Sequence, residues 1–144
     1  MIYIGADHRG YDLKEKIKLY LKDQGIEHED LGNFKYEEED DFPDFANLVV
    51  EKIIEDPERN RGILICGTGV GMDMAANRNK NIRSVLAATP EIAIASKKAD
   101  NTNILSLGAD FVGEKKAEEI VKAWLGAQFA REERHQRRLD KIDT

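Results

Sequence analysis

Ten residues, Gly62-Ile-Leu-Ile-Cys66-Gly-Thr-Gly-Val-Gly71, determine the architecture that this chain can adopt. The first half is an uninterrupted apolar run, which is typical of a strand buried on both faces of a parallel sheet. The second half alternates glycine with other residues and leads into Met74, Ala75 and Ala76, which favour a helix. A buried strand that turns through glycines into a helix indicates a parallel α/β fold.

The same alternation continues on both sides of this segment. Strands are predicted over Met1–Ala6, Ile26–Leu31, Gly62–Cys66, Ser84–Ala88 and Asn103–Leu107. Helices are predicted over Tyr11–Asp23, Phe42–Ile54, the stretch from the glycines to about Asn79, Glu91–Lys98 and Lys115–Gly126. Five strands separated by helices predict a doubly wound α/β domain with a parallel sheet covered on both faces.

Composition limits the kinds of partner. The 144 residues, 41% of them hydrophobic, suit one domain over 1–144, and the net charge of −6 argues against nucleic acid or an acidic membrane. No basic leader and no run of about 18 apolar residues occur, so no membrane segment is expected. The single cysteine, Cys66, excludes an internal disulfide and a multi-cysteine metal site, and fits the cytoplasm.

Two predicted turns carry side chains suited to chemistry. Ligands of open α/β sheets bind at the carboxyl ends of the strands. The turn after the first strand, Gly5-Ala-Asp7-His8-Arg9-Gly10, offers a carboxylate, an imidazole and a guanidinium at that edge. The alternative is that Asp7 only caps the next helix and His8 is an ordinary surface residue.

The glycine turn is the second candidate. Its backbone N–H groups, at Gly67, Thr68, Gly69, Val70 and Gly71, and the positive end of the following helix favour a phosphate or a developing oxyanion. The alternative is a turn needed only for tight packing. No Gly-Lys-Ser/Thr follows and the G-x-G-x-x-G spacing is absent, which argues against a nucleotide.

Cys66 stands at the mouth of the glycine turn, where the helix end would favour a thiolate that acts as a base or a nucleophile. Residue 72 is methionine, where a phosphocysteine mechanism would need an arginine, so the role of base is preferred. The acidic stretch Glu37–Asp41 is predicted to be a solvated loop without a metal.

The C-terminal arm, residues 127–144, has few apolar residues and many arginines. We expect either a solvated terminal helix or an arm that docks on another subunit. Arg134 and Arg138 would share one helix face and could clamp a phosphate. The alternative is that they pair with acidic neighbours on the same helix, namely Glu132, Glu133 and Asp140.

Several motifs in order resemble the ribose-5-phosphate isomerase B family, to which galactose-6-phosphate isomerase subunits are also similar. They are Gly-Ala-Asp7-His8-x-Gly, Asp-Phe42-Pro43-Asp-Phe, the block Gly62–Gly71, Ala75-Ala-Asn77 and Arg134-His135-Gln. The resemblance spans essentially the whole chain. It implies a Rossmann-like three-layer α/β/α sandwich, a homodimer or tetramer with interfacial active sites, and isomerisation of aldose and ketose phosphates without a metal or cofactor. The implied substrate is ribose 5-phosphate, in the pentose phosphate pathway.

The resemblance also implies roles for individual residues. Cys66 would move a proton between C1 and C2 through an enediolate, while Thr68 and the glycine-turn amides stabilise the oxygen. Asp7 and His8 would hold hydroxyls or open the sugar ring. Arg134 and Arg138, at least one from a partner, would hold the phosphate.

Three positions depart from the family pattern. Ala99 and Asp100 stand where the family usually has histidine and asparagine, and Asp110 stands where it often has a phosphate-binding arginine. One explanation is that His135 or His8 opens the ring and that Arg9 or a lysine replaces the lost charge. The others are a different substrate, such as a six-carbon sugar phosphate whose hydroxyls bind Asp100 and Asp110, or a binding module without turnover. An oxidoreductase would need the missing dinucleotide motif.

Overall fold

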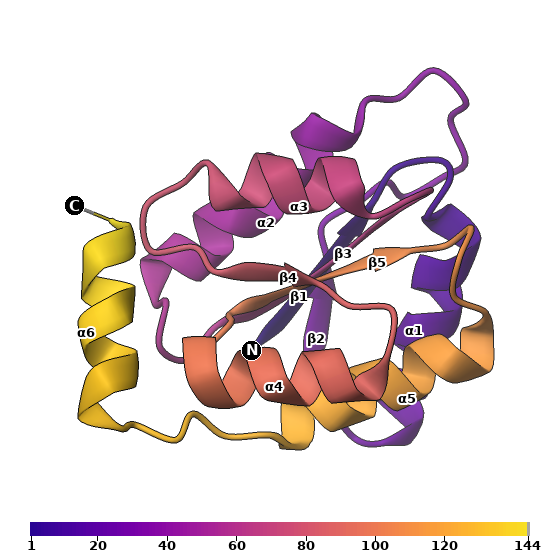
Figure 1. Cartoon of the computed structure of the whole chain (residues 1–144). Coiled ribbons are helices and arrows are strands. Elements are labelled where there is room, and N and C mark those ends of the chain that lie inside the picture. Colours follow the sequence, from indigo (N-terminus) through magenta and orange to yellow (C-terminus); the bar gives the residue numbers. More distant parts are fainter. Residues whose placement is uncertain (144) are drawn as a thin grey trace.

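The computed structural model describes residues 1–143, so that Thr144, the last residue of the predicted arm, lies outside it (Figure 1). The strands are β1 (Ile2–Ala6), β2 (His28–Asp30), β3 (Arg61–Cys66), β4 (Ser84–Leu86) and β5 (Ile104–Gly108). The helices are α1 (Tyr11–Asp23), α2 (Phe42–Glu55), α3 (Val70–Asn77), α4 (Pro90–Asp100), α5 (Glu114–Gly126) and α6 (Glu133–Ile142).

The five strands form one parallel sheet in the order β2-β1-β3-β5-β4, which confirms the predicted α/β architecture. Helices α1, α4 and α5 cover one face, where their apolar residues pack in one core cluster (Figure 1). Helices α2 and α3 cover the other face around a second cluster. The result is the expected three-layer α/β/α sandwich.

The edge strands are shorter than predicted. Strand β2 pairs with β1 over three residues instead of the predicted Ile26–Leu31, and β4 pairs with β5 over three instead of Ser84–Ala88. Each is an edge strand with one hydrogen-bonded neighbour. The apolar residues Ile26 and Ala88, which were included in the predicted strands, lie outside the paired residues. The backbone N–H of Ile26 donates to the carbonyl of Leu21 at 2.9 Å, so Ile26 belongs to the turn that closes α1 and not to the strand.

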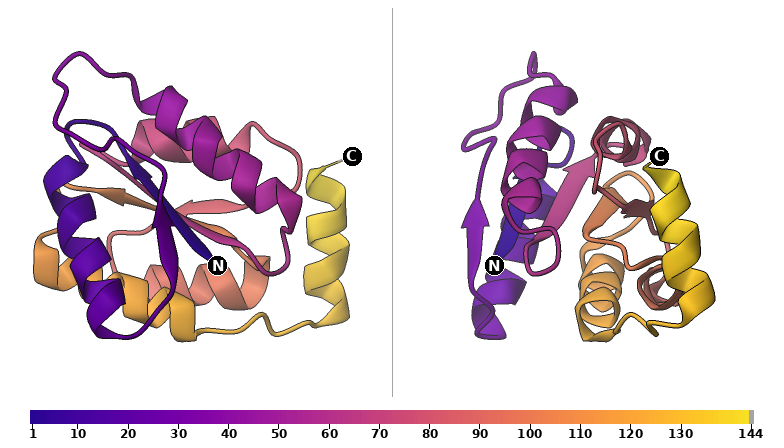
Figure 2. Two further views of the ribbon diagram at one scale, coloured as in Figure 1. Left: turned by 180° about the vertical axis from the view of Figure 1, so that it is seen from behind. Right: turned by 90° about the vertical axis from the view of Figure 1, so that its left-hand side faces the viewer.

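Helix α6 confirms that the arm is helical. It stands at one end of the sandwich, next to the amino ends of the strands (Figure 2). The sandwich holds it through Leu139, which is buried, and just after the helix the backbone N–H of Asn81 donates to Asp143 Oδ2 at 3.0 Å. Among residues 1–143, no helix has both the length and the apolar character to cross a membrane.

A buried ion pair joins α1 to the edge strand β2. Lys14 is fully buried, and its Nζ donates to both carboxylate oxygens of Asp30 at 2.8 Å and to the carbonyl of Asn33. Lys18 Nζ donates to the same carboxylate at 2.7 Å. Burial alone would raise the pKa of Asp30, but the hydrogen bonds from the two lysines outweigh it and lower that pKa.

Asp30→Ala should lower the free energy of unfolding by about 3–5 kcal/mol, because it removes the carboxylate that accepts the hydrogen bonds of the buried Lys14 ammonium and leaves only the half-exposed Glu15, at 3.5 Å, as a counter-charge. The contribution is present above the ordinary Asp pKa of 3.8 and is lost as the pH falls through the lower folded-state pKa. Urea denaturation at pH 7 and at pH 3 measures both effects. Glu55→Ala, which removes the exposed partner of Lys52, is the control and should cost less than about 1 kcal/mol. Equal effects of the two substitutions would contradict this account.

Candidate active site

The turns after β1 and β3 lie against each other at the carboxyl edge of the sheet. The backbone N–H of Asp7 donates to the carbonyl of Ile65 at 3.3 Å. A β-carbon on residue 10 would lie 2.3 Å from that carbonyl oxygen, so only glycine fits there. This close approach places Asp7, His8 and Arg9 beside the turn that carries Cys66.

Cys66 is the last residue of β3 and is 5% exposed. The backbone N–H of Gly69 donates to its Sγ at 3.1 Å. Gly69 has φ = 77° as the residue before α3, a conformation that side chains with a β-carbon rarely adopt. The backbone N–H of Val70 donates to Thr68 Oγ1 at 3.2 Å. The glycine turn therefore presents a thiol, a hydroxyl and the start of a helix together.

Asp7 is buried behind this turn, with an exposed fraction of 5%. Its Oδ1 accepts the backbone N–H groups of Arg9 and Gly10 at 3.0 Å each. The capping role considered for Asp7 is thus partly correct, since it satisfies amides just before α1. Burial raises the pKa of Asp7, which makes its carboxylate a better proton acceptor near neutral pH.

His8 is held by a carboxylate that the sequence did not single out. Asp40 Oδ1 lies 2.7 Å from His8 Nδ1 and accepts the backbone N–H of His8 at 2.9 Å, while Asp40 Oδ2 accepts Asn33 Nδ2 at 2.7 Å. Because both carboxylate oxygens act as acceptors, Nδ1 carries its hydrogen and Nε2 is the nitrogen left for chemistry. The hydrogen bond to Asp40 raises the pKa of His8.

The prediction that Glu37–Asp41 is a solvated loop is wrong at Asp40, whose side chain is 9% exposed. In the sequence, Asp40 looks like its acidic neighbours, and nothing local distinguishes it. Only the fold of the loop back onto the turn after β1 brings Asp40 to His8. Tyr36, on the same loop, adds an edge-on contact to the His8 ring at 6.1 Å.

Asp7, His8 and Asp40 are also the group of described residues whose ligand atoms lie close enough, within 4.8 Å, to hold a metal ion. Their atoms already have protein partners: Asp7 accepts two amides, and Asp40 accepts from His8 and Asn33. We interpret the group as an acid–imidazole arrangement for proton transfer.

Arg9 and Asp110 form an ion pair across the mouth of the site. Arg9 Nη2 donates to Asp110 Oδ2, and the backbone N–H of Asp110 donates to the carbonyl of Gly67 at 2.9 Å. The Arg9 guanidinium lies over the glycine turn, since a β-carbon on Gly67 would be 2.3 Å from Arg9 Cζ. A guanidinium is therefore present beside the turn even though residue 110 is an aspartate.

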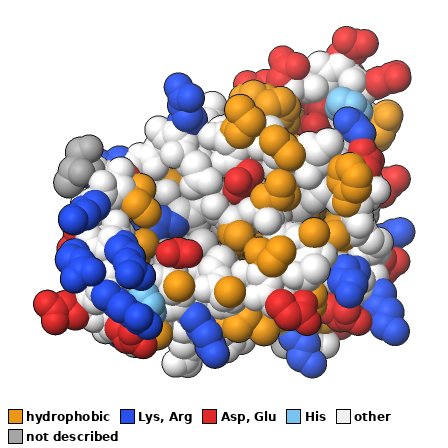
Figure 3. Space-filling model, viewed as in Figure 1, with side chains coloured by type: hydrophobic (Ala, Val, Ile, Leu, Met, Phe, Trp, Pro, Cys, Tyr) orange, Lys and Arg blue, Asp and Glu red, His pale blue; other side chains and the backbone are white. Residues whose placement is uncertain are grey.

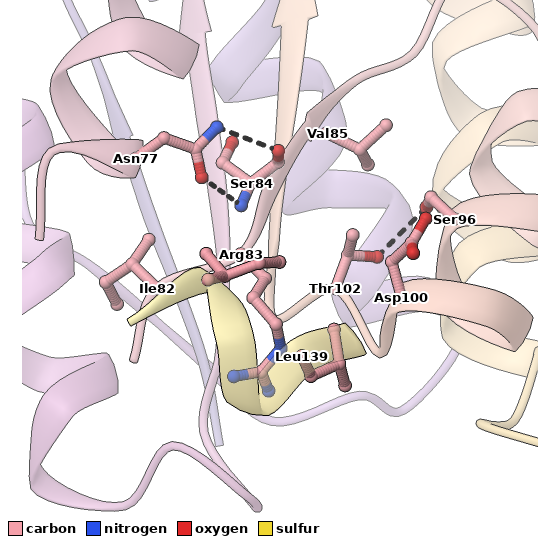
Figure 4. A pocket seen from close by; sticks show the side chains of 10 residues that line it. Asn77, Ile82, Arg83, Ser84, Val85, Ser96, Asp100, Thr102 and Leu139 are labelled. Atoms are coloured by element: carbon pink, nitrogen blue, oxygen red, sulfur yellow. Dashed lines mark hydrogen bonds between the residues drawn. The ribbon is translucent and has the colours of Figure 1, made fainter. Parts of the chain in front are cut away.

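The remaining predicted site residues lie at the opposite, amino edge of the sheet. Asp100 ends α4 and lines a cavity of about 210 Å³ with Arg83, Ser84 and Leu139 (Figure 4). A strand of five residues spans about 16 Å, so this cavity and Cys66 are separated by the length of the sheet. Within one chain, Asp100 and Cys66 do not meet.

The arm residues are on the same side as Asp100. Arg134 and Arg138 are exposed on α6, where Lys and Arg side chains gather on the surface (Figure 3). Arg134 Nε donates to Glu132 at 2.8 Å, which was the alternative considered for it. His135 is 9% exposed, its ring lies 6.2 Å from that of Phe129, and its Nδ1 has no hydrogen-bond partner among the described residues.

A thiol, a carboxylate beside an imidazole, and backbone amide donors meet at two adjoining turns, an arrangement that suits an isomerase moving a proton between neighbouring carbons of a small substrate. The sequence model of the family described as Ribose/Galactose Isomerase matches residues 2–142. The chain belongs to this family.

Individual relatives agree with that assignment. The ribose-5-phosphate isomerase B of Escherichia coli is 41% identical over 98% of this chain and 93% of its own length. A probable ribose-5-phosphate isomerase B of Mycoplasma genitalium is 42% identical over 98% of this chain and 92% of its own. The crystal structure of a ribose 5-phosphate isomerase from Thermotoga maritima superposes with a TM-score of 0.94, at 44% identity over 99% of this chain and 96% of that one.

Proposed function

We propose that this chain interconverts ribose 5-phosphate and ribulose 5-phosphate with its own side chains and without a cofactor. The observation that carries the proposal is the Cys66 thiol at the glycine turn, with the Gly69 amide directed at its sulfur. A Mycoplasma genitalium relative, 42% identical, has a crystal structure described as having bound ribulose-5-phosphate, which supports the choice of sugar.

Proton transfer would centre on Cys66. Its thiolate removes the proton from C2 of the open aldose, and the electron pair forms an enediolate with negative charge on O1. The thiol returns the proton to C1, while the proton on O2 moves to O1, which leaves the ketose. Thr68 and the amides of the glycine turn donate to the charged oxygen, and one such donor contributes about 10²–10³ in rate.

Ring opening would use His8 and Asp7. The substrate enters as a closed furanose, so that His8 Nε2 gives a proton to the ring oxygen as the C1–O4 bond breaks, and Asp7 takes the proton of O1. Asp40 is a positioning residue, because it fixes the His8 tautomer and favours the protonated imidazole. This assignment accounts for Ala99, where the family usually has a histidine. His135 lies at the other edge of its own chain.

The phosphate clamp would come from a second copy. Arg134 and Arg138 lie too far along the sheet to reach Cys66 of their own chain, so a homodimer is the smallest assembly that unites them. Around the glycine turn, Val70, Met74 and Phe111 are 46%, 64% and 76% exposed, an apolar surface that suits a partner. Pairing of dimers into a tetramer stays a prediction. A reducing compartment such as the cytoplasm suits a catalytic free thiol.

A six-carbon sugar phosphate is the second candidate substrate. Asp100 supports it, because its exposed carboxylate has no ion pair among residues 1–143 and could accept a further hydroxyl. Asp110 gives less support, since it is already paired with Arg9. Both substrates therefore belong in the first assay.

Cys66→Ala should lower kcat for ribose 5-phosphate by about 10²–10⁴, because the proton transfer loses its base. Conversion to ribulose 5-phosphate, followed for the wild type and the variant, measures this, with a hexose 6-phosphate assayed in parallel. Lys122→Ala, at an exposed position in the last two turns of α5, is the control for handling and should retain activity. Turnover that survives in Cys66→Ala would remove Cys66 as the base.

His8→Asn should lower kcat/KM for ribose 5-phosphate about 10²-fold or more, yet spare exchange of the C1 hydrogen of ribulose 5-phosphate with D₂O. The ketose is open-chain, because its C5 oxygen carries the phosphate, so exchange needs only Cys66. Asp40→Asn should lower the pKa of His8 and move the high-pH limb of kcat/KM to lower pH, because the protonated form is the acid. NMR exchange rates and pH profiles test both effects. A parallel loss of exchange and turnover would contradict the ring-opening role.

Mixing two inactive variants tests the shared site. Cys66→Ala and the double variant Arg134→Ala/Arg138→Ala should each have little activity alone. Random dimers of the two would be half heterodimers with one intact site of two, so about a quarter of the wild-type activity should return. Native mass spectrometry verifies the heterodimers. Heterodimers without activity would overturn the clamp across the interface.

A further inference from the structure

A group of basic side chains surrounds a cavity at the amino edge of the sheet, and the nearest carboxylates, such as that of Glu58, act on them only at longer range than an ion pair. The chain has 28 acidic and 22 basic residues, so acidic partners are plentiful. Nevertheless Arg61, Lys97 and Arg131, which line this cavity of about 290 Å³, form no ion pair within residues 1–143. We call these three residues the amino-edge cluster. The neighbouring Arg83 is likewise without an ion pair in that part of the chain.

Lys97 is the buried member of the cluster, with an exposed fraction of 6%. Its Nζ donates to the carbonyl of Thr102 at 3.2 Å and lies 4.3 Å from the centre of the Trp124 ring. An ammonium group has three hydrogens, so this single hydrogen bond leaves others available at the cavity wall. Burial, together with Arg61 and Arg83, lowers the pKa of Lys97 to about 7. A buried cation that repels two others is stabilised by an anion.

The two arginines of the cluster have donors to spare. Arg61 uses Nη1 for the carbonyls of Pro57 and Asn60, at 3.2 and 2.8 Å, and a guanidinium has five N–H groups. Arg131 contacts the ring of Phe129 at 6.0 Å and is exposed at the mouth. Glu58 is the acidic residue among those lining the cavity, and it forms no ion pair with the cluster.

We propose that the amino-edge cluster binds a phosphate-type oxyanion, either inorganic phosphate or a phosphomonoester. The guanidinium groups of Arg61 and Arg131 can each donate two parallel hydrogen bonds to oxygens of such a group, and the Lys97 ammonium supplies a compact positive charge. Arg61 is the first residue of β3 and Cys66 is the last, so this pocket lies at the opposite end of the strand from the thiol. Arg134 and Arg138, which are assigned above to the substrate site of a second copy, do not line this pocket.

The charges around Lys97 give the binding a pH dependence. A bound anion stabilises the ammonium form, so binding above pH 7 takes up a proton and the affinity falls as the pH rises. The other charged groups near Lys97 are Arg61, Arg83 and Arg131, and Glu58 is the acidic one. Sulfate does not titrate in this range, and because the His135 ring lies 6.2 Å from that of Phe129 at the cavity wall, the Lys97→Met variant is needed to assign the pH dependence to the lysine.

Trp124 makes the test specific, because it is the single tryptophan of the chain and packs on Lys97. Titration with sulfate, phosphate and glycerol 3-phosphate, followed by Trp124 fluorescence and calorimetry, should give a saturable change at pH 6.5 that weakens at pH 8.5. Tighter binding of glycerol 3-phosphate than of phosphate would assign the pocket to a phosphomonoester. Equal affinities would assign it to the free anion.

Three variants decide the outcome. Arg131→Ala leaves the Lys97–Trp124 contact in place and should weaken anion binding about tenfold. Lys97→Met keeps the apolar part of the side chain and should abolish the pH dependence of binding. Lys98→Met removes an equal charge from the exposed side of α4 and should bind like the wild type. Melting temperatures verify folding. No saturable change in the wild type, or the same affinity in Arg131→Ala, would overturn the proposal.

Discussion

The carbonyl group of Ile65 occupies the space where a β-carbon of residue 10 would be, and the arrangement of the candidate site depends on this close approach. With glycine at position 10, the turn after β1 lies directly on the end of β3, and the acid and imidazole of one turn stand beside the thiol of the other. A side chain there would force the two turns apart. The side chains of Asp7, His8 and Cys66 are therefore placed by a backbone contact between two strands of a rigid sheet. Such a contact fixes their positions more firmly than contacts between mobile side chains would.

Two ion pairs place charged groups around this frame. Asp110 stands where related sequences often have an arginine, yet Arg9, from a different turn, pairs with it and brings a guanidinium over the glycine turn. In the same way, Asp40 supplies a carboxylate for His8 from a loop that is otherwise exposed. A guanidinium and a carboxylate held by an imidazole are thus both present beside Cys66. This pattern favours a retained isomerase over a binding module.

The sequence was sufficient to predict the sheet, its central strands and the helices, because the apolar periodicity that defines them is local. Edge strands were predicted too long, since their apolar residues continue beyond the ladder. Asp40 was missed because its role arises from a contact 32 residues away in sequence. The separation of Asp100 from Cys66 follows from topology: a helix that connects parallel strands ends at their amino edge, so residues at its end cannot lie beside the end of a strand in the same chain. The roles of the individual site residues stay predictions.

The thiol at the end of β3 is the only cysteine of the chain. No second thiol competes with Cys66 for peroxide or an alkylating reagent. Every modification of cysteine in this protein is therefore a modification of the candidate base. An exposed fraction of 5% limits such reagents to those that fit the crevice. Oxidation of this one sulfur atom therefore reports the redox state of the compartment. Titration of the same atom with a thiol reagent counts the functional sites.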